Sequence, residues 1–173
     1  MEKKARILIV VDMQHDFISG SLGSGEAQVI VPRVKAKIQE YIKRGDRVLF
    51  TRDTHHENYL ETAEGKALPV VHCMEGTPGW EIPQELDRTD CKHIDKPNFG
   101  WQHWQAEQLG DGEIELVGLC TDICVVSNAL LLKTYYPENV IKVDGTCCAG
   151  VTPESHRAAL ETMKMCQIQV TGM

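Results

Sequence analysis

The 173-residue sequence contains no apolar stretch close to the roughly 20 residues that a membrane-spanning helix requires. Its first apolar run begins at Ile7 and already stops at Asp12, which is too short for the core of a signal peptide. We therefore expect no membrane partner and no secretory leader.

An excess of positive charge is also lacking. Lys and Arg number 18 against 25 Asp and Glu, so the formal net charge is −7 with neutral histidine. Phosphate backbones are bound by basic faces, so this balance argues against a nucleic-acid partner. The 42% hydrophobic content excludes disorder as the main state.

Internal repeats, low-complexity tracts and linkers are absent from the sequence as well. Globular domains average about 150 residues, so residues 1–173 are expected to form a single domain. A domain of this size buries about 70% of the surface of its unfolded chain, and it needs no disulfide bonds for stability.

Cysteine is present but in an odd number, so not all of these residues can pair within one chain. The simplest interpretation is a set of free, mostly buried thiols. Free thiols are typical of the reducing cytoplasm, which is the expected compartment. The seven positions are Cys73, Cys91, Cys120, Cys124, Cys147, Cys148 and Cys166.

Short apolar runs alternate with segments of helical periodicity along the chain. Strands are predicted over 6–11, 47–51, 93–95, 113–118, 140–143 and 167–170. Helices are predicted over 34–42 after Pro32, over 101–109 and 121–136, and from Thr152-Pro153 onward. This alternation indicates an α/β fold with a mostly parallel sheet.

Polar residues fall where these strands end. Asp12, Asp53 and Lys96 each follow a predicted strand, as does the turn from Gly118 to Cys124. Ligands of open α/β sheets bind outside the carboxyl ends of the strands. Four segments therefore converge, by topology, on one crevice.

Cys124 is expected in the first turn of a helix that begins near Thr121. A helix N-terminus stabilises a thiolate, and its free N–H groups can hold an oxyanion. Position alone, however, favours a buried structural cysteine. The spacing of Cys120 from Cys124 is not the two-residue gap of redox motifs, so a redox or metal pair has weak support.

Asp12 and Lys96 also have two interpretations each. A carboxylate in a desolvated crevice has a raised pKa, which suits a general base, whereas an aspartate at a strand end often only caps a loop. Lys96 lies at the same crevice, whereas a lysine is usually a solvated surface residue.

A third group of polar residues could hold a metal. Asp53 and His55 lie at alternate positions and can point the same way in an extended segment, and Glu64 and His72 follow. Two histidines and a carboxylate suit Zn²⁺, Fe²⁺ or Mn²⁺. A polar loop with scattered histidines is the alternative.

Taken together, these segments resemble the isochorismatase-like cysteine hydrolase superfamily, and within it the nicotinamidases. The similarity runs in order from Ile7 to Val170. It rests on Asp12-x-Gln14-x-Asp16-Phe17, Asp53-x-His55, His72-Cys73-x-x-Gly76-Thr77-x-Gly79, Lys96-x-x-Phe99 and Gly118-x-x-Thr121-Asp122-x-Cys124-Val125.

The resemblance implies a three-layer α/β/α fold with a six-stranded, mostly parallel sheet. It also implies an amidohydrolase in which Cys124 is the nucleophile, Asp12 its general base and Lys96 the cation of the triad. A cis peptide at Leu119–Cys120 would let the Cys120 and Cys124 amides form an oxyanion hole.

The remaining implied roles concern the metal and the substrate. Asp53, His55 and His72 would bind a divalent ion, with zinc expected first, and Glu64 is a further candidate ligand. Phe17 and Phe99 would flank the ring of a small amide substrate. A homo-oligomer is an expectation from the resemblance alone.

The sequence departs from many nicotinamidases near the metal. Leu68-Pro69-Val70-Val71 stands where a tryptophan usually precedes the last histidine ligand, and no second loop histidine lies between His55 and His72. A metal-independent hydrolase of N-carbamoyl or other small amides is therefore the alternative. A catalytically silent metal-binding module and a thiol redox protein are more remote.

Overall fold

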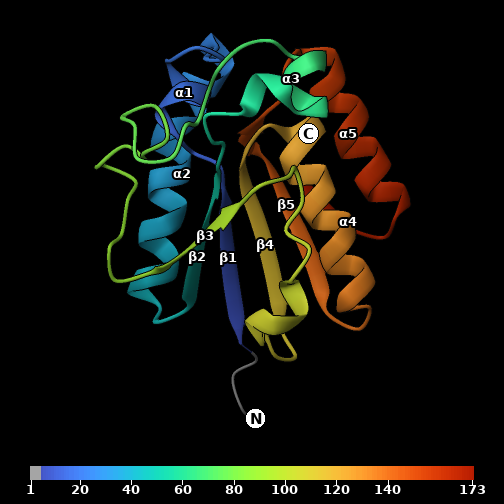
Figure 1. Ribbon diagram of the computed structural model, residues 1–173. Helices are drawn as coiled ribbons and strands as arrows, with labels where there is room; N and C mark the ends of the chain where they lie inside the picture. The colour runs from blue at the N-terminus through green and yellow to red at the C-terminus, as the bar shows by residue number, and fades with distance from the viewer. Residues whose placement is uncertain (1–4) are drawn as a thin grey trace.

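The computed structural model describes residues 5–173 as one open sheet with helices on both faces (Figure 1). The sheet has six strands in the order β3-β2-β1-β4-β5-β6, and every neighbouring pair is parallel. This is the three-layer α/β/α architecture that the resemblance implied.

The strands are β1 (Arg6–Val11), β2 (Arg47–Asp53), β3 (Lys92–Lys96), β4 (Glu113–Leu119), β5 (Val140–Ala149) and β6 (Gln169–Thr171). The α-helices are α1 (His15–Ile18), α2 (Gly25–Lys43), α3 (Ala63–Ala67), α4 (Val126–Tyr135) and α5 (Pro153–Met165). Three shorter helical turns are η1 (Tyr59–Glu61), η2 (Trp104–Glu107) and η3 (Thr121–Val125).

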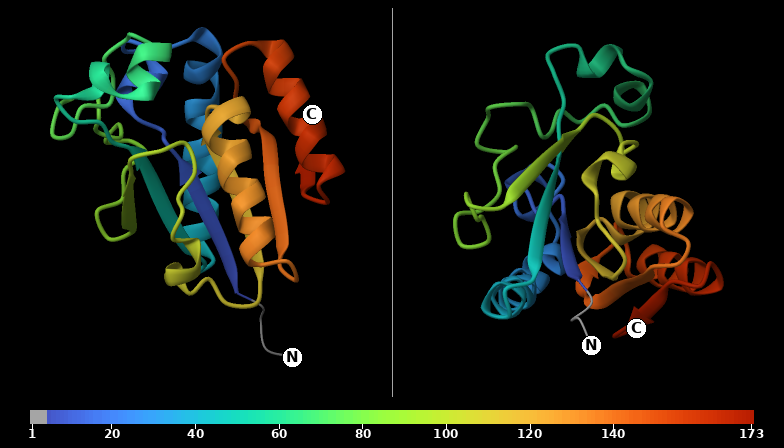
Figure 2. Two further views of the ribbon diagram at one scale, coloured as in Figure 1. Left: turned by 45° about the vertical axis from the view of Figure 1, so that its right-hand side comes forward. Right: turned by 90° about the horizontal axis from the view of Figure 1, so that it is seen from below.

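Strand β1 explains why the sheet is covered on both faces. Its side chains alternate, and those of Ile7 and Ile9 pack with α4 and α5, whereas those of Leu8 and Val10 pack with α2. All four are buried, as the continuous apolar run predicts for a central parallel strand. The two views of Figure 2 show α2 on one side of the sheet and α4 with α5 on the other.

Helix α2 begins earlier than the sequence predicted, at Gly25 rather than after Pro32. The Ser24 side chain caps its first turn by accepting a hydrogen bond from the Ala27 amide. Ala27 and Ile30 are buried in the core, so this part of the helix is held by packing despite Pro32 inside it. Tertiary contacts thus override the helix boundary that Pro32 predicts.

Two other segments differ from their predicted form. Residues 101–109 contain only the short turn η2, whose Trp104 is fully buried. Strand β5 continues to Ala149, past the polar Asp144 that follows the predicted strand end at Val143. Asp144 is tolerated there because it forms an ion pair with Lys37 of α2.

The register of the sheet aligns the ends of the strands that carry the polar residues. Val11 is paired with Thr51 and Gly118, and Asp53 is paired with Lys96.

Among residues 5–173, no helix is both long enough and apolar enough to cross a membrane.

Candidate active site

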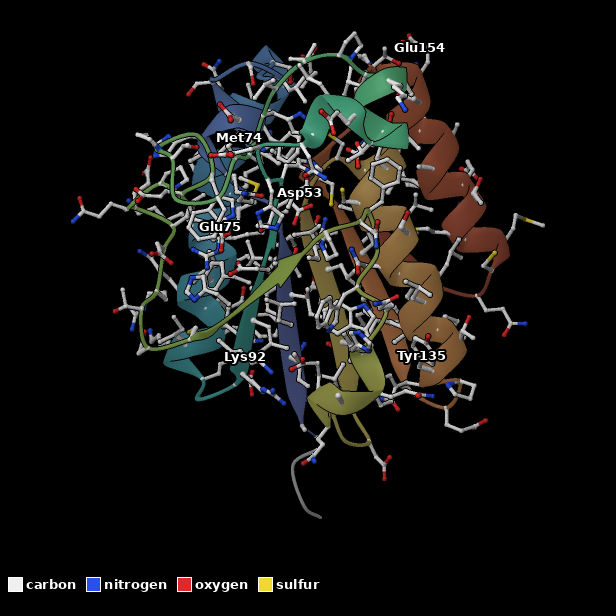
Figure 3. The ribbon with its side chains drawn as sticks, in the orientation of Figure 1. Asp53, Met74, Glu75, Lys92, Tyr135 and Glu154 are labelled. Atoms are coloured by element: carbon white, nitrogen blue, oxygen red, sulfur yellow. The ribbon has the colours of Figure 1, made fainter. Side chains whose placement is uncertain are left out.

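The candidate site lies at the carboxyl edge of the sheet, where the strand ends meet. In Figure 3, Asp53 lies near this upper edge, whereas Lys92 lies lower, at the start of β3. Gly118 of β4 permits close packing of the strands here, because a Cβ atom at this position would lie 2.1 Å from the Val11 carbonyl oxygen. Its φ of +118° also favours glycine.

Asp12, Lys96 and Cys124 form one contiguous buried group. Lys96 Nζ lies 2.6 Å from Asp12 Oδ2 and 3.6 Å from Cys124 Sγ. The side chains of Asp12 and Lys96 are fully buried, and Cys124 is 4% exposed. The structure thus brings together the three residues that the sequence placed in a triad.

The backbone and a threonine hold Asp12 in place. Its φ of +47° is unusual for a residue other than glycine, and its amide donates to the Thr51 carbonyl oxygen at 3.1 Å. The Thr51 hydroxyl donates to Asp12 Oδ1 at 2.6 Å. Oδ2 therefore remains directed toward Lys96.

Burial controls the protonation of the triad. It raises the pKa of Asp12, although the Lys96 charge opposes that rise. Burial alone would lower the pKa of Lys96, but the Asp12 charge raises it above its usual value. The ammonium group is therefore charged, and the carboxyl group has a basicity suited to proton transfer.

Burial also determines the protonation of the nucleophile. Burial raises the pKa of the Cys124 thiol well above its ordinary value, even with Lys96 adjacent. A resting thiolate stabilised by a helix N-terminus is thus not what the structure indicates. The thiol is protonated at rest, so its activation requires a base, and Asp12 is the candidate for that role.

The turn that carries Cys124 has an unusual backbone. The peptide bond Leu119–Cys120 is cis, as the resemblance implied, and η3 begins directly after it as a π-helical turn. Cys120 and Cys124 both line the cavity described below.

Four candidate metal ligands converge beside the triad. Asp53 Oδ2, His55 Nε2, Glu64 Oε1 and His72 Nε2 lie within 4.8 Å of one another. Of these four residues only Glu64, from α3, is not buried. His55 Nε2 has no hydrogen-bond donor or acceptor partner of its own, although the Asp53 carboxylate lies 2.9 Å away. This convergence of nitrogen and oxygen donors fits a divalent metal ion.

Neighbouring groups orient these donors. His72 Nδ1 lies 2.7 Å from the Val70 carbonyl oxygen, so the ring donates there and leaves Nε2 free to ligate. Burial would raise the pKa of Asp53, but the adjacent His55 and His72 lower it below its usual range. Asp53 is thus a carboxylate, and its Oδ1 lies 3.6 Å from Lys96 Nζ.

A cavity of about 410 Å³ connects the nucleophile with the metal ligands. Cys124, Asp53 and His72 line one part of it, and apolar side chains line much of the rest. Phe17 and Phe99 both line it, as expected, although Phe99 is 45% exposed.

Sequence reasoning gave no role to three buried residues that support this site. Gln14 donates to the Asp53 carbonyl oxygen at 2.8 Å and accepts from the Asp53 amide at 2.7 Å. Thr51 holds Asp12, and Asn128 bonds to the Cys124 carbonyl oxygen. Gln14 lies within the quoted motif, but nothing in the sequence alone distinguished Thr51 or Asn128 from ordinary strand and helix residues.

Known proteins with related sequences include nicotinamidases. A nicotinamidase of Schizosaccharomyces pombe is 27% identical over 94% of this chain and 91% of its own. A nicotinamidase/pyrazinamidase of Mycobacterium tuberculosis is 26% identical over 95% of this chain and 97% of its own.

Solved structures show the same fold over nearly the whole chain. A pyrazinamidase of Pyrococcus horikoshii in complex with zinc superposes with a TM-score of 0.84 at 29% identity, covering 97% of this chain and 99% of its own. A nicotinamidase/pyrazinamidase of Bacillus subtilis gives 0.85 at 25% identity, covering 97% and 100%. The isochorismatase domain matches residues 6–173, and the chain therefore belongs to the isochorismatase family.

Proposed function

We propose that this protein is a metal-containing cysteine amidohydrolase that converts nicotinamide and water to nicotinate and ammonia. The observation that carries the proposal is the contact of Lys96 Nζ with Asp12, Cys124 and Asp53 at once. It joins a nucleophile, a base and a metal-ligand cluster at a single cavity. The related nicotinamidases support amide hydrolysis as the reaction class.

The first half-reaction forms an acyl-enzyme. Asp12 takes the proton of the Cys124 thiol, whose raised pKa makes this transfer necessary. The sulfur attacks the amide carbonyl carbon, and the charged Lys96 stabilises the developing negative charge nearby. The Cys120 and Cys124 amides would hold the oxyanion.

The acyl-enzyme is complete when ammonia leaves, and its hydrolysis is the second half-reaction, which releases the acid. Asp12 returns its proton to the amide nitrogen, the C–N bond breaks and ammonia leaves a thioester on Cys124. Water then attacks the thioester, giving its proton to Asp12, and the C–S bond breaks to return the thiol. Asp12 thus acts alternately as base and acid.

Asp53, His55 and His72, with Glu64 as a further ligand, would hold the metal. When bound, the ion supplies a Lewis-acid position for the ring nitrogen of the substrate and for water. Zinc is the ion that we propose, and the zinc-bound Pyrococcus pyrazinamidase supports it. The same donors also suit Fe²⁺ and Mn²⁺.

The substrate class follows from this combination. A pyridine carboxamide presents a neutral ring nitrogen to the metal-ligand cluster and a carboxamide to Cys124, whereas an aliphatic amide leaves the cluster unused. A metal-independent N-carbamoyl hydrolase is the alternative, and it gives no reason for four donor atoms within 4.8 Å. We further propose a cytoplasmic enzyme that takes part in NAD salvage.

An ammonia-release screen tests the proposal. Purified protein is assayed with nicotinamide, pyrazinamide and N-carbamoyl compounds, and the same sample is analysed for metal. The expected result is turnover of the two ring amides, about one divalent ion per chain, and loss of activity on chelation. Metal-free protein whose amidase activity ignores chelators would overturn the proposal in favour of the N-carbamoyl alternative.

A further inference from the structure

Asn128 is a fully buried amide with four hydrogen bonds. It lies in α4 and is 0% exposed. Its Nδ2 group donates to the carbonyl oxygens of Cys124 at 2.8 Å and Phe99 at 3.1 Å. Its Oδ1 atom accepts from the Trp101 amide at 2.8 Å and from Trp104 Nε1 at 3.0 Å. A side-chain amide has two donor hydrogens and two acceptor lone pairs, so its capacity is fully used.

The four partners belong to two separate segments of the chain. One is the turn that carries the nucleophile, since the bond to the Cys124 carbonyl oxygen reaches back one helical turn. The other is the segment from Phe99 to Trp104, which follows β3 and its terminal Lys96. Asn128 thus links the turn that carries Cys124 to the segment that follows Lys96; this link is called the Asn128 tie below.

The segment held by Asn128 also fixes Lys96. Lys96 Nζ donates to the Asn98 carbonyl oxygen at 3.1 Å, and Asn98 directly precedes Phe99, whose carbonyl oxygen Asn128 binds. Lys96 in turn contacts both Asp12 and Cys124. A shift of the Phe99 segment would therefore move the ammonium group relative to the thiol.

We infer that Asn128 is a positioning residue that sets the distance between Cys124 and Lys96; the inference rests on the proposed function only for its activity readout. Asn128 does not line the cavity, and it bonds the carbonyl oxygen of Cys124 rather than its sulfur. Misplacement of reacting groups by about 1 Å can reduce the rate about a hundredfold, so the tie affects turnover more than binding.

Two substitutions separate the contributions of the tie. Asn128→Leu has similar size and removes all four bonds. Asn128→Asp keeps the acceptor oxygen for Trp101 and Trp104 but loses the donors to Cys124 and Phe99. The matched control is Asn139→Leu, since Asn139 is 8% exposed and its side chain donates to the Gly110 carbonyl oxygen, outside the site.

The experiment measures kcat and KM for nicotinamide, bound metal and the melting temperature of each variant. We expect both Asn128 variants to lose kcat about 10- to 100-fold, with KM changed less than about threefold and metal content unchanged. Asn139→Leu should keep its kcat even if it melts earlier. Wild-type kcat in a folded Asn128 variant, or a kcat loss fully explained by lost folded protein or metal, would overturn the inference.

A second readout needs no amidase activity. The rate at which iodoacetamide alkylates Cys124 is measured against pH, because the distance of Lys96 from the sulfur affects how readily the thiol ionises. A shifted pH profile in the Asn128 variants, but not in Asn139→Leu, supports the tie even if no amide is hydrolysed. An unchanged profile contradicts it. If Asn128→Leu does not fold, Asn128→Thr carries the test, since its hydroxyl can bond only the carbonyl one turn back.

Discussion

At the scale of single residues, the proposed reaction depends on one thiol among seven. Cys124 is distinguished by its contact with Lys96, which lies 3.6 Å away, and not by an intrinsically low pKa. Burial also raises the pKa of Cys120, to about 12, so neither thiol is poised for redox exchange. This favours a hydrolase over the thiol redox protein that the sequence left open.

Substitution of the two cysteines gives the first prediction. Cys124→Ala should lower kcat at least about a thousandfold, because the covalent step is lost, while the small side chain preserves the fold. Cys120→Ala should stay within about tenfold of wild type, since only the Cys120 backbone amide is used. Ammonia release from nicotinamide measures both, and equal losses would point to a cysteine pair.

Asp12 gives the second prediction. Asp12→Asn keeps the shape and the bond from Thr51 but cannot accept the thiol proton, so kcat should fall about 10²–10⁴-fold. Single-turnover ammonia release reports the acylation step directly. Retention of activity within a few-fold would remove Asp12 from the mechanism.

Two adjacent histidines give the third prediction. His55 is buried beside Asp53, whereas the side chain of His56 is 62% exposed and faces Glu75. His55→Ala should weaken metal binding at least 10- to 100-fold and abolish turnover of nicotinamide, and His56→Ala should do neither. Metal titration of the two variants separates them, and equal affinities would exclude His55 as a ligand.

At the scale of elements, α2 is fixed to the sheet by charge as well as by its apolar face. Lys37 of α2 lies 2.9 Å from Glu115 of β4 and 2.8 Å from Asp144 of β5. Burial would raise the pKa of Asp144, but the hydrogen bond from Lys37 lowers it below its usual value. This cluster lets β5 continue past a polar residue.

The fourth prediction concerns this cluster. Lys37→Met should destabilise the fold by about 1.5–3 kcal/mol near pH 7, because two part-buried carboxylates lose a charged donor. Since the Asp144 pKa is lowered in the folded state, its stabilisation is complete above the unfolded pKa of about 3.9 and is lost as pH falls below it.

Urea unfolding near pH 7 and near pH 3 measures the effect. The difference between wild type and Lys37→Met should shrink at the lower pH. Lys35→Met is the control, since Lys35 and Glu85 form an exposed pair worth at most about 1 kcal/mol. A difference independent of pH would show that Asp144 is not the partner that matters.

At the scale of the whole molecule, a mostly parallel sheet between helices could be predicted, because apolar runs alternate with helical segments and the central strand residues are apolar on both faces. The edge where Asp12, Asp53 and Lys96 meet follows from that topology alone. The start of α2 and the end of β5 could not be predicted, because packing of Ala27 and Ile30 and pairing of Asp144 override local signals.

The positions of the candidate catalytic and metal-binding residues could be predicted from the sequence, whereas the residues that hold them in place could not. The candidate residues that stand at motif positions are Asp12, Lys96 and Cys124, together with Asp53, His55 and His72. The support from Thr51 and Asn128 depends on contacts between distant segments, which spacing along the chain does not reveal. The thiol's raised pKa likewise reflects burial, which only the structure shows.

The central claim is that Cys124 forms a thioester with the acyl group of nicotinamide. Rapid acid quench of the metal-loaded enzyme with nicotinamide, followed by peptide mass spectrometry, tests it directly. The proposed mechanism predicts a nicotinoyl group on the peptide that contains Cys124. The amount of this modified peptide should be lower in Asp12→Asn, and the modification should be absent in Cys124→Ala. Steady ammonia release from nicotinamide with no acyl group on Cys124, or with one on another cysteine, would contradict it.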